Sequence, residues 1–493
     1  MAGRYSNNSR RSKKQGILPA LLVILTVILC AALILLLVLT IAERQEQKPT
    51  DPTGITTTTP TTTPPTTQAP TTVPPTTAAP TEPPIPEEAQ ALMDQANFIA
   101  AGYDYEKAIA MLEGSAYFAS VPQMTDLVEQ YRVLESQLVR YAKPETVTHV
   151  FFHSLIVDTD RAFDGDGDAS GYNMYMTTVD EFIAMMESMY ERGYVLITPY
   201  DLAYEVTDEN GTRFVYGDIM LPEGKKPFIM SQDDLNYYGY MISSGHGKNE
   251  VPRYVDGNND GFAHKLVIGE DGYPTCEYMD ADGNITTGDY DLVPILETFI
   301  QEHPDFSYRG ARAVLGVTGY EGVFGYRTKP GYNVNNGGVM SMDDWNAEVE
   351  QAKAVAQCLK EHGWIIASHS YGHPAYGNIG ASRVRADSDK WENTVQPVVG
   401  DADIILYPHG SDIAGAEKYD FNNGSFKALY EDGYRYFFNV DSAIYWNQLG
   451  PNYFRGGRRN LDGVRMYHNP DLLDDLFDVE SVFDKARPTP VPR

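Results

Sequence analysis

Two pairs of residues in this sequence have the types and the spacing of a metal site. Asp233 and Asp234 directly follow one apolar run, and His369 and His373 directly follow another. Two imidazoles four positions apart face the same side of a helical turn, so both could bind one ion, although Gly372 makes a regular helix there uncertain. Two histidines and one carboxylate leave coordination positions open for water, which is the arrangement of a catalytic divalent-metal site.

Each pair also has an ordinary structural explanation when it is taken alone. An Asp-Asp pair after a strand is commonly a solvated loop or a helix cap, and most His-x-x-x-His pairs are not ligands. Adjacent carboxylates repel each other unless a cation compensates them. The occurrence of both pairs after apolar runs favours the metal site over the separate explanations.

Apolar strands and amphipathic helices alternate in the part of the chain that carries these pairs. Strands are predicted at 147–153, 193–197, 227–231, 364–368, 404–407 and 436–440, and helices at 178–191, 341–362 and 425–432. This alternation predicts an α/β fold with a parallel sheet, either doubly wound or closed as a barrel. Active sites of such folds form at the carboxyl ends of the strands, which is where both pairs lie.

Two acidic segments match a calcium-binding loop only in part. The segment at 164–168 reads D-G-D-G-D, but Ala169 stands where the loop needs Gly and Tyr175 where it needs the closing Glu. The segment at 256–261 has the Gly but lacks the closing Glu. We interpret both as solvated turns. The second belongs to an insert at 244–290, rich in Gly, Asp and Asn, that predicts an antiparallel hairpin.

The N-terminal segment predicts a membrane anchor. Residues 1–16 carry five basic side chains and no acidic one, and residues 17–42 are apolar without a single charge. A run of about 20 apolar residues crosses the hydrocarbon core, and the basic side stays in the cytoplasm. The sequence thus predicts a single-pass protein of the cell membrane with everything after residue 42 outside the cell. A cleaved signal peptide is the alternative, which the length of the run and the lack of an Ala-x-Ala site disfavour.

The chain that follows divides by composition. Residues 43–86 are dominated by Thr and Pro, which cannot bury a core and form an extended spacer. Residues 87–145 carry apolar side chains with a 3.6-residue period and predict a short helical neck. The net charge of −30 argues against nucleic acid as a partner. Cys276 and Cys358, the two cysteines beyond the apolar run, form no disulfide framework, and whether they pair is left open.

The order of several segments resembles the polysaccharide deacetylase family, carbohydrate esterase family 4, whose domain is the NodB-homology domain. The segment S-Q-D-D at 231–234 is similar to the family's first motif, T-F-D-D, and H-S-Y-G-H at 369–373 matches its second, H-S/T-x-x-H. The resemblance extends over about residues 146–475, and we place the domain at 146–480 and a tail at 481–493. Weaker matches are V-F-F-H-S at 150–154, Y-P-H-G at 407–410, N-V-D-S at 439–442 with Trp446 following, and M-Y-H at 466–468.

The resemblance implies a fold and a set of roles. The fold would be a distorted, partly open (β/α) barrel, with zinc or a similar divalent ion such as cobalt on Asp234, His369 and His373. Asp233 would be the general base, and His468 the acid that protonates the departing amine. The remaining positions that it implies are Asp441, which would tune His468, and the oxyanion or substrate contacts His409, Tyr407 and Trp446. Tyr237 is a further candidate substrate contact because of its place beside the Asp pair.

The third motif departs from the family pattern. Leu406 stands where the family usually has the Arg that orients the base, so Arg455 or Arg465 would have to substitute in space. His409 replaces an aromatic residue but keeps the backbone N–H that would stabilise an oxyanion. The tyrosines at 237–240 follow the first motif directly and are either core residues or a surface that stacks on sugar rings.

These features together predict a metal-dependent hydrolase that removes N-acetyl groups from a cell-wall or extracellular polysaccharide. The N-acetylglucosamine or N-acetylmuramic acid units of peptidoglycan are the expected substrates, because an anchor followed by a spacer suits a cell-wall setting. Two alternatives stay open. One is an esterase that removes O-acetyl groups with the same metal site, and the other is a degenerate wall module that binds carbohydrate without turnover.

Overall fold

The computed structural model describes residues 84–493 except 210, 243–250, 252–258 and 442. The predicted basic tail, the membrane helix and nearly all of the Thr/Pro spacer lie outside these residues. Within the described part of the chain, no helix has both the length and the apolarity that crossing a bilayer requires. The described residues belong to one compact unit, Pro83–Arg493.

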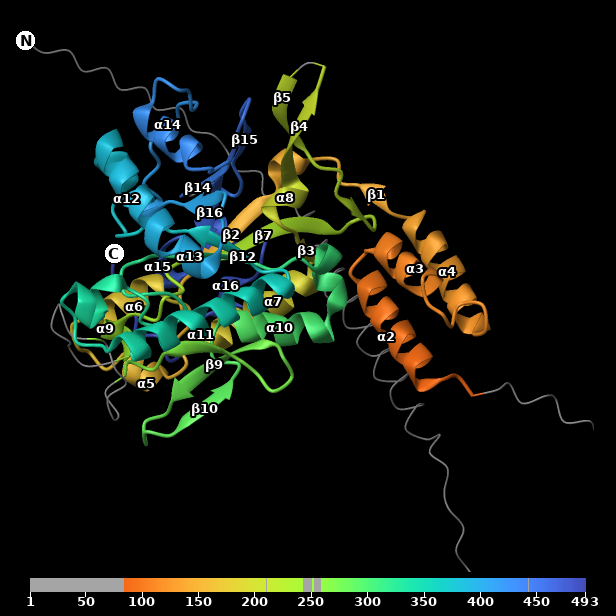
Figure 1. The fold of residues 1–493 in the computed structure, drawn as a ribbon, viewed down its shortest axis with the longest axis horizontal. Coiled ribbons are helices and arrows are strands. Elements are labelled where there is room, and N and C mark those ends of the chain that lie inside the picture. Colours follow the sequence, from red (N-terminus) through yellow and green to blue (C-terminus); the bar gives the residue numbers. More distant parts are fainter. Residues whose placement is uncertain (1–83, 210, 243–250, 252–258, 442) are drawn as a thin grey trace, which may run out of the picture. The chain divides into compact units, whose positions relative to one another are not determined.

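Seven parallel strands form a closed ring in this unit (Figure 1). Around the ring they are β2 (Thr148–Phe152), β7 (Lys226–Gln232), β11 (Val314–Val317), β12 (Ile365–Ser368), β13 (Ile404–Leu406), β14 (Tyr436–Val440) and β16 (Phe454–Asn460). The resemblance implied a partly open barrel, but β16 pairs with β2 and β7 with β11, so hydrogen bonding runs around the whole ring. The pairing is shortest between β12 and β13, which share the single paired position Ser368–Ile405.

The pleat of each strand turns every second side chain into the ring. Many of these side chains are apolar and pack in one cluster that includes Ile229, Val314 and Phe438. Nearer the carboxyl ends of the strands, Ser231 and Arg458 are fully buried. Buried polar groups need hydrogen-bond partners, so this part of the interior must be a connected polar network.

Helices cover the outside of the ring, as the predicted alternation requires (Figure 1). The longer ones are α7 (Val179–Glu191), α10 (Leu292–Glu302), α11 (Met342–Glu361), α12 (Ala381–Thr394) and α14 (Gly424–Glu431). Three of them confirm the helices predicted at 178–191, 341–362 and 425–432. α7 begins with a capping box, in which the Thr178 hydroxyl accepts from the Glu181 N–H and the Glu181 carboxylate accepts from the Thr178 N–H.

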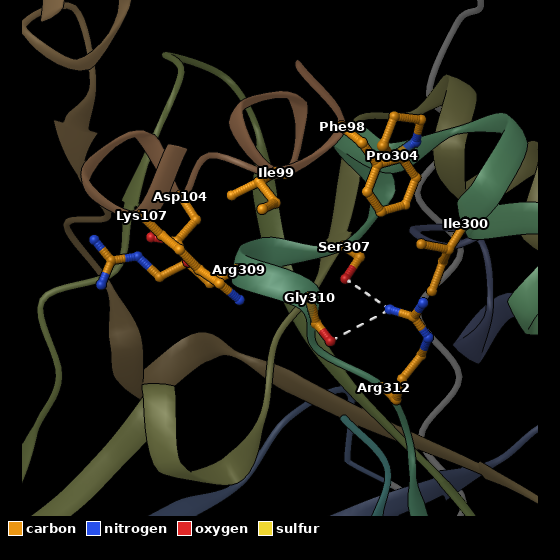
Figure 2. Close-up of a pocket in the computed structure, with 11 residues that line it drawn as sticks. Phe98, Ile99, Asp104, Lys107, Ile300, Pro304, Ser307, Arg309, Gly310 and Arg312 are labelled. Atoms are coloured by element: carbon orange, nitrogen blue, oxygen red, sulfur yellow. Dashed lines mark hydrogen bonds between the residues drawn. The ribbon is translucent and has the colours of Figure 1, made fainter. Parts of the chain in front are cut away.

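The predicted helical neck contains three helices, α2 (Glu87–Ala101), α3 (Tyr105–Glu113) and α4 (Pro122–Glu135). They share an apolar cluster with the amino ends of the barrel strands, and the Tyr103 hydroxyl donates to the Asp305 carbonyl at 2.9 Å. A cavity of about 130 Å³ lies at this junction, between the α2–α3 turn and residues 304–312. Figure 2 shows the residues that line it. There Arg312 donates to Ser307 and to the Gly310 carbonyl.

Two antiparallel sheets lie outside the ring. The predicted insert forms a three-stranded sheet of β8 (Lys265–Ile268), β9 (Pro274–Met279) and β10 (Ile285–Gly288) instead of a single hairpin. A second hairpin, β4 (Ala203–Asp208) with β5 (Gly211–Tyr216), was not predicted. Its first residue, Ala203, accepts from the hydroxyl of Tyr436 at the amino end of β14. The hairpin therefore lies at the end of the barrel opposite to the carboxyl ends.

Short elements complete the unit. The extra strand β3 (Tyr194–Leu196) pairs with the start of β7, and β15 (Asn447–Leu449) runs antiparallel to β16. The others are β1 (Val139–Arg140) paired with β6 (Met220–Leu221), and the helices α5 (Thr159–Ala162), α6 (Ala169–Tyr175), α8 (Pro199–Leu202), α9 (Gly239–Ile242), α13 (Gln396–Val399), α15 (Gly463–His468) and α16 (Val479–Val482).

Candidate metal centre

The fold brings the three predicted ligands together at the carboxyl ends of β7 and β12. One ligand atom from each of Asp234, His369 and His373 lies within 4.8 Å of the others. Asp234 Oδ2 is 3.5 Å from His373 Nε2 and 3.9 Å from His369 Nε2. Two imidazoles and one carboxylate around a common point fit a divalent cation with open coordination positions.

His369 is oriented for this role by the neighbouring strand. Its Nδ1 lies 2.7 Å from the carbonyl oxygen of Leu406 in β13. Because a carbonyl only accepts, Nδ1 must carry the hydrogen, and the lone pair is then on Nε2, the atom that faces Asp234. Leu406 stands where the resemblance led us to expect an Arg, and its backbone fixes the tautomer of the ligand candidate His369.

Asp234 is held in place by an aromatic hydroxyl and by backbone geometry. Tyr238 donates to Asp234 Oδ1 at 2.6 Å, which leaves Oδ2 toward the histidines. Burial favours the neutral acid, but His369, His373 and His153 outweigh it and lower the pKa of Asp234.

The loops of the site carry unusual backbone conformations. Non-glycine residues with positive φ are disfavoured and collect where function constrains the chain. Of the eight such residues in the described chain, five lie in these loops: Asp234, Tyr237, Ser370, His373 and His409.

Asp233 is a separate, fully paired carboxylate beside the ligand cluster. Arg458 Nη1 and Nη2 donate to its two oxygens at 2.6 and 2.9 Å, and both side chains are buried. Burial alone would favour the neutral acid, but Arg458 and then His369 hold the pKa of Asp233 well below its usual range.

The arginine that pairs with Asp233 is therefore neither of the two that the sequence suggested. Arg455 donates to Asp412 and to backbone carbonyls, and Arg465 donates to Asn460. Arg455 lies on the opposite face of β16 from Arg458, because side chains alternate along a strand, and Arg465 lies on α15. Arg458 lies three residues beyond Arg455, on the interior side of β16. The sequence feature that could have indicated Arg458 is the pair Arg458-Arg459, because two adjacent charged residues are unusual inside a strand.

His468 and Asp441 are not brought to the cluster by any contact among the described residues. His468 ends α15, and its Nε2 lies 2.9 Å from the Val491 carbonyl at the end of the chain. Asp441 accepts from the Ala443 N–H at 2.8 Å. The predicted pairing of His468 with Asp441 is therefore wrong, because the last turn of α15 faces the C-terminal residues.

His153 takes the position next to the cluster that was expected of His468. It follows β2 directly, and its positive charge would lower the pKa of Asp233 and of Asp234. Its Nδ1 is 3.1 Å from the Tyr175 carbonyl, so Nδ1 carries the hydrogen and Nε2 is left for another partner. The V-F-F-H-S segment marked this strand, but its histidine was not recognised as a site residue.

The predicted substrate contacts divide into near and distant ones. The His409 ring packs edge-on to His373 at 4.4 Å between centroids, and its role as a backbone donor stays a prediction. Tyr407 is buried and its hydroxyl is hydrogen-bonded to that of Tyr419. Tyr237 is buried and its hydroxyl donates to Asp291. Both are core residues and cannot contact a substrate.

Trp446 contacts Arg455, and its role as a substrate contact stays a prediction. The Arg455 guanidinium lies 4.8 Å from the centre of its ring. This contact places Trp446 against an arginine that serves another part of the structure.

A cavity of about 290 Å³ opens onto the ligand cluster. It is lined by Asp234, Tyr238, Tyr240, Tyr320, Gly372 and His373. Its walls are thus two ligand candidates and three tyrosines, and it is the place where a substrate would meet the metal site.

The two acidic turns meet each other elsewhere. Asp166 and Asp168 from the first turn and Asp260 from the second have carboxylate oxygens within 4.8 Å of one another. Burial, together with the charges of Asp166, Asp168 and Asp164, raises the pKa of Asp260 to about 6, although the Tyr172 hydroxyl opposes the shift. The described cluster contains carboxylates alone, without the imidazoles that distinguish the site at Asp234.

Comparison with known proteins gives only distant likenesses. No family model and no curated protein matches this sequence. The chain is similar to the Streptococcus pyogenes deacetylase PplD in complex with acetate, at 12% identity and a TM-score of 0.34, over 67% of this chain and 98% of that chain. It is also similar to a chitin deacetylase from the fungal pathogen Colletotrichum lindemuthianum, at 14% identity and a TM-score of 0.20, over 38% of this chain and 74% of that chain. Likenesses of this size carry no functional assignment, so the function has to be argued from the side chains.

Proposed function

We propose that this chain is a metal-dependent polysaccharide deacetylase. The observation that carries the proposal is the position of Asp233: a carboxylate paired with Arg458 lies 3.9 Å from Nε2 of the ligand candidate His369. A site that only bound a metal would need no second carboxylate there. Hydrolysis needs a base beside the attacking water, and Asp233 is placed for that task.

The donor set fits the divalent ion that the resemblance implies. Asp234, His369 and His373 would hold it, because their free donor atoms already converge. Zinc or cobalt bound there would supply a Lewis acid for the acetyl carbonyl.

Asp233 and His153 would divide the proton transfers between them. Asp233 is ionised at neutral pH and accepts the proton of the attacking water. The amine that leaves an amide must be protonated as the C–N bond breaks, which requires an acid. His153 is the candidate, since its Nε2 is unoccupied by the contact with Tyr175 and its charge acts on both carboxylates.

The substrate class follows from the cavity and from the rest of the chain. A cavity walled by tyrosines suits a sugar ring better than a charged polymer, and a net charge of −30 repels polyanions. Residues 17–42 would anchor the enzyme in the cell membrane and residues 43–86 would space it from the bilayer. We therefore expect N-acetylated sugars of peptidoglycan or of another extracellular polysaccharide as substrates.

Acetate release tests the proposal directly. N-acetylated and O-acetylated oligosaccharides are incubated with the protein after chelation and after addition of Zn²⁺ or Co²⁺. We expect metal-dependent release from the N-acetylated substrate. Release from the O-acetylated substrate alone would make the protein an esterase, and no release from either with metal present would leave a binding module.

A further inference from the structure

Two tyrosines with exposed rings line the cavity above the metal-ligand candidates. Tyr240 is 42% exposed and Tyr320 is 52% exposed, and both border the cavity together with Asp234 and His373. Burying an aromatic side chain is strongly favourable, so rings left open around a functional cavity indicate a surface that binds a ligand.

Tyr238 joins these two rings and connects them to the ligand cluster. Its ring is nearly parallel to that of Tyr240, at 17° and 5.9 Å between centroids, and edge-on to that of Tyr320, at 74° and 5.9 Å. Its hydroxyl donates to Asp234. Tyr240 also stacks on Tyr172 at 11°. The two exposed rings are therefore held at a steep angle to each other and at a fixed position relative to a metal-ligand candidate.

A corner of two aromatic rings beside a polar centre suits a pyranose ring. The C–H groups of such a sugar form an apolar surface that packs on an aromatic ring, while its hydroxyls stay at the polar rim. The cavity of about 290 Å³ is at the lower end of the range of about 300–1,000 Å³ for ligand sites, so it has room for one ring and not for several.

We propose that Tyr240 and Tyr320 form the binding subsite for the sugar ring that carries the acetyl group. This subsite rests on the proposed deacetylase function. It selects a carbohydrate by stacking, and it directs the acetyl substituent of the stacked ring toward Asp234 and His373. The neighbouring sugars of the polymer extend outside the cavity.

Steady-state kinetics with two substrates test the subsite. A tetramer of N-acetylglucosamine has the sugar ring, and 4-nitrophenyl acetate has the acetyl group without it. We expect Tyr240→Ala and Tyr320→Ala each to raise the ratio of KM for the tetramer to KM for the ester by about tenfold, the effect of losing one aromatic contact. Tyr240→Phe and Tyr320→Phe keep the ring and should restore the wild-type ratio. Tyr204→Ala, an equally exposed tyrosine on the β4–β5 hairpin at the other end of the barrel, is the matched control.

An unchanged ratio, or Phe variants as impaired as the Ala variants, would overturn the subsite. If the wild-type protein with metal releases acetate from neither substrate, the proposed function fails, and the subsite is then decided by binding. Calorimetric titration of the tetramer in EDTA should show affinity that either Ala variant weakens by about tenfold. No binding, or equal binding by wild type and variants, would refute it.

Discussion

Asp233 and Arg458 form the ion pair on which the proposed chemistry depends. Asp233 directly follows β7 and Arg458 lies on β16, and both strands are neighbours of β2 in the ring. Both side chains are inside the barrel, where an unpaired charge is costly. Arg458 also donates to Ser231, whose hydroxyl is hydrogen-bonded to His149. The ion pair is therefore part of a buried network of polar side chains.

Arg458→Met should impair both the chemistry and the fold. Without the guanidinium, burial raises the pKa of Asp233, so the acid limb of the pH profile of kcat/KM should move to higher pH. Removing one partner of a buried pair should lower the free energy of unfolding by about 3–5 kcal/mol in urea denaturation at pH 7. Arg458→Lys keeps the positive charge, so its acid limb and its free energy of unfolding should lie between those of the wild type and of Arg458→Met. An acid limb that stays in place would contradict the role of Arg458.

His153 and His468 give opposite expectations as proton donors. His153→Gln should lower kcat for an N-acetylated oligosaccharide by about 10²–10⁴-fold, the usual contribution of a general acid. His468→Gln removes only a contact to the last residues of the chain and should leave kcat within about threefold, since its partners lie outside the site. Acetate release measured on both variants decides between them, and the reverse pattern would restore His468 as the acid.

Asp260 should make stability depend on pH. Its pKa is raised from 3.8 to about 6 in the folded chain. Between these values the unfolded chain has released the proton while the folded chain retains it, so the free energy of unfolding falls as pH rises through this window and stays lower above it. Asp260→Asn should flatten the curve there, as measured by urea denaturation between about pH 4 and 7. Parallel curves for variant and wild type would show that the pKa of Asp260 is not raised in the folded chain.

The convergence of the three ligand candidates was predictable from the sequence because Asp234 lies just after β7 and both histidines lie just after β12. Asp234, His369 and His373 needed only the rule that parallel strands end at one edge. Arg458 was not predictable, since its partner depends on which strands are neighbours around the ring. The contacts of His468 with the C-terminal residues were not predictable either, because a motif late in the chain carries no information on which way the last turn of α15 faces.

At the scale of elements, the prediction found α7 and α11 but missed other regular elements, namely α10, α12 and β16. α7 and α11 have long amphipathic patterns and capping residues, and their bounds fall within a residue of the prediction. β11 was not predicted although β12, of the same length, and the shorter β13 were, so its length is not the reason. The β4–β5 hairpin is mostly exposed, so its sequence lacks the alternation that marks a half-buried strand. Ring closure was missed because it depends on pairing between β7 and β11.

The C-terminal segment and α6 form a connection that reaches the proposed proton donor. Arg487 donates to both oxygens of Glu181 and to the carbonyls of Asn173 and Met176, and the two charged side chains are fully buried. These carbonyls flank Tyr175, whose own carbonyl accepts from His153.

Arg487→Met should therefore act on stability and on turnover together. An unpaired Glu181 should lower the free energy of unfolding by about 3–5 kcal/mol, and a displaced Tyr175 carbonyl should lower kcat while the metal affinity stays unchanged. Urea denaturation, acetate release and a zinc titration measure the three quantities. Arg493→Ala, which removes a surface contact to His468, is the control and should change none of them. Weaker zinc binding in Arg487→Met would show a general loss of structure and not an effect through His153.

At the scale of the whole molecule, metal binding and folding should be coupled. Asp234 and His369 come from segments more than one hundred residues apart, so the converging donor set exists only in the folded chain. A ligand that binds the folded state alone stabilises it by about 2.7 kcal/mol at a free concentration one hundredfold above Kd. Zinc should therefore raise the Tm of the wild-type protein in calorimetry, and EDTA should reverse the rise.

Asp234→Ala and His373→Ala should lose the zinc-dependent rise, because each removes a donor. Asp233→Asn should keep the rise and lose acetate release, because Asp233 bonds to Arg458 and is the proposed base, not a ligand. A zinc-dependent rise in Asp234→Ala as large as that of the wild type would place the metal elsewhere in the chain.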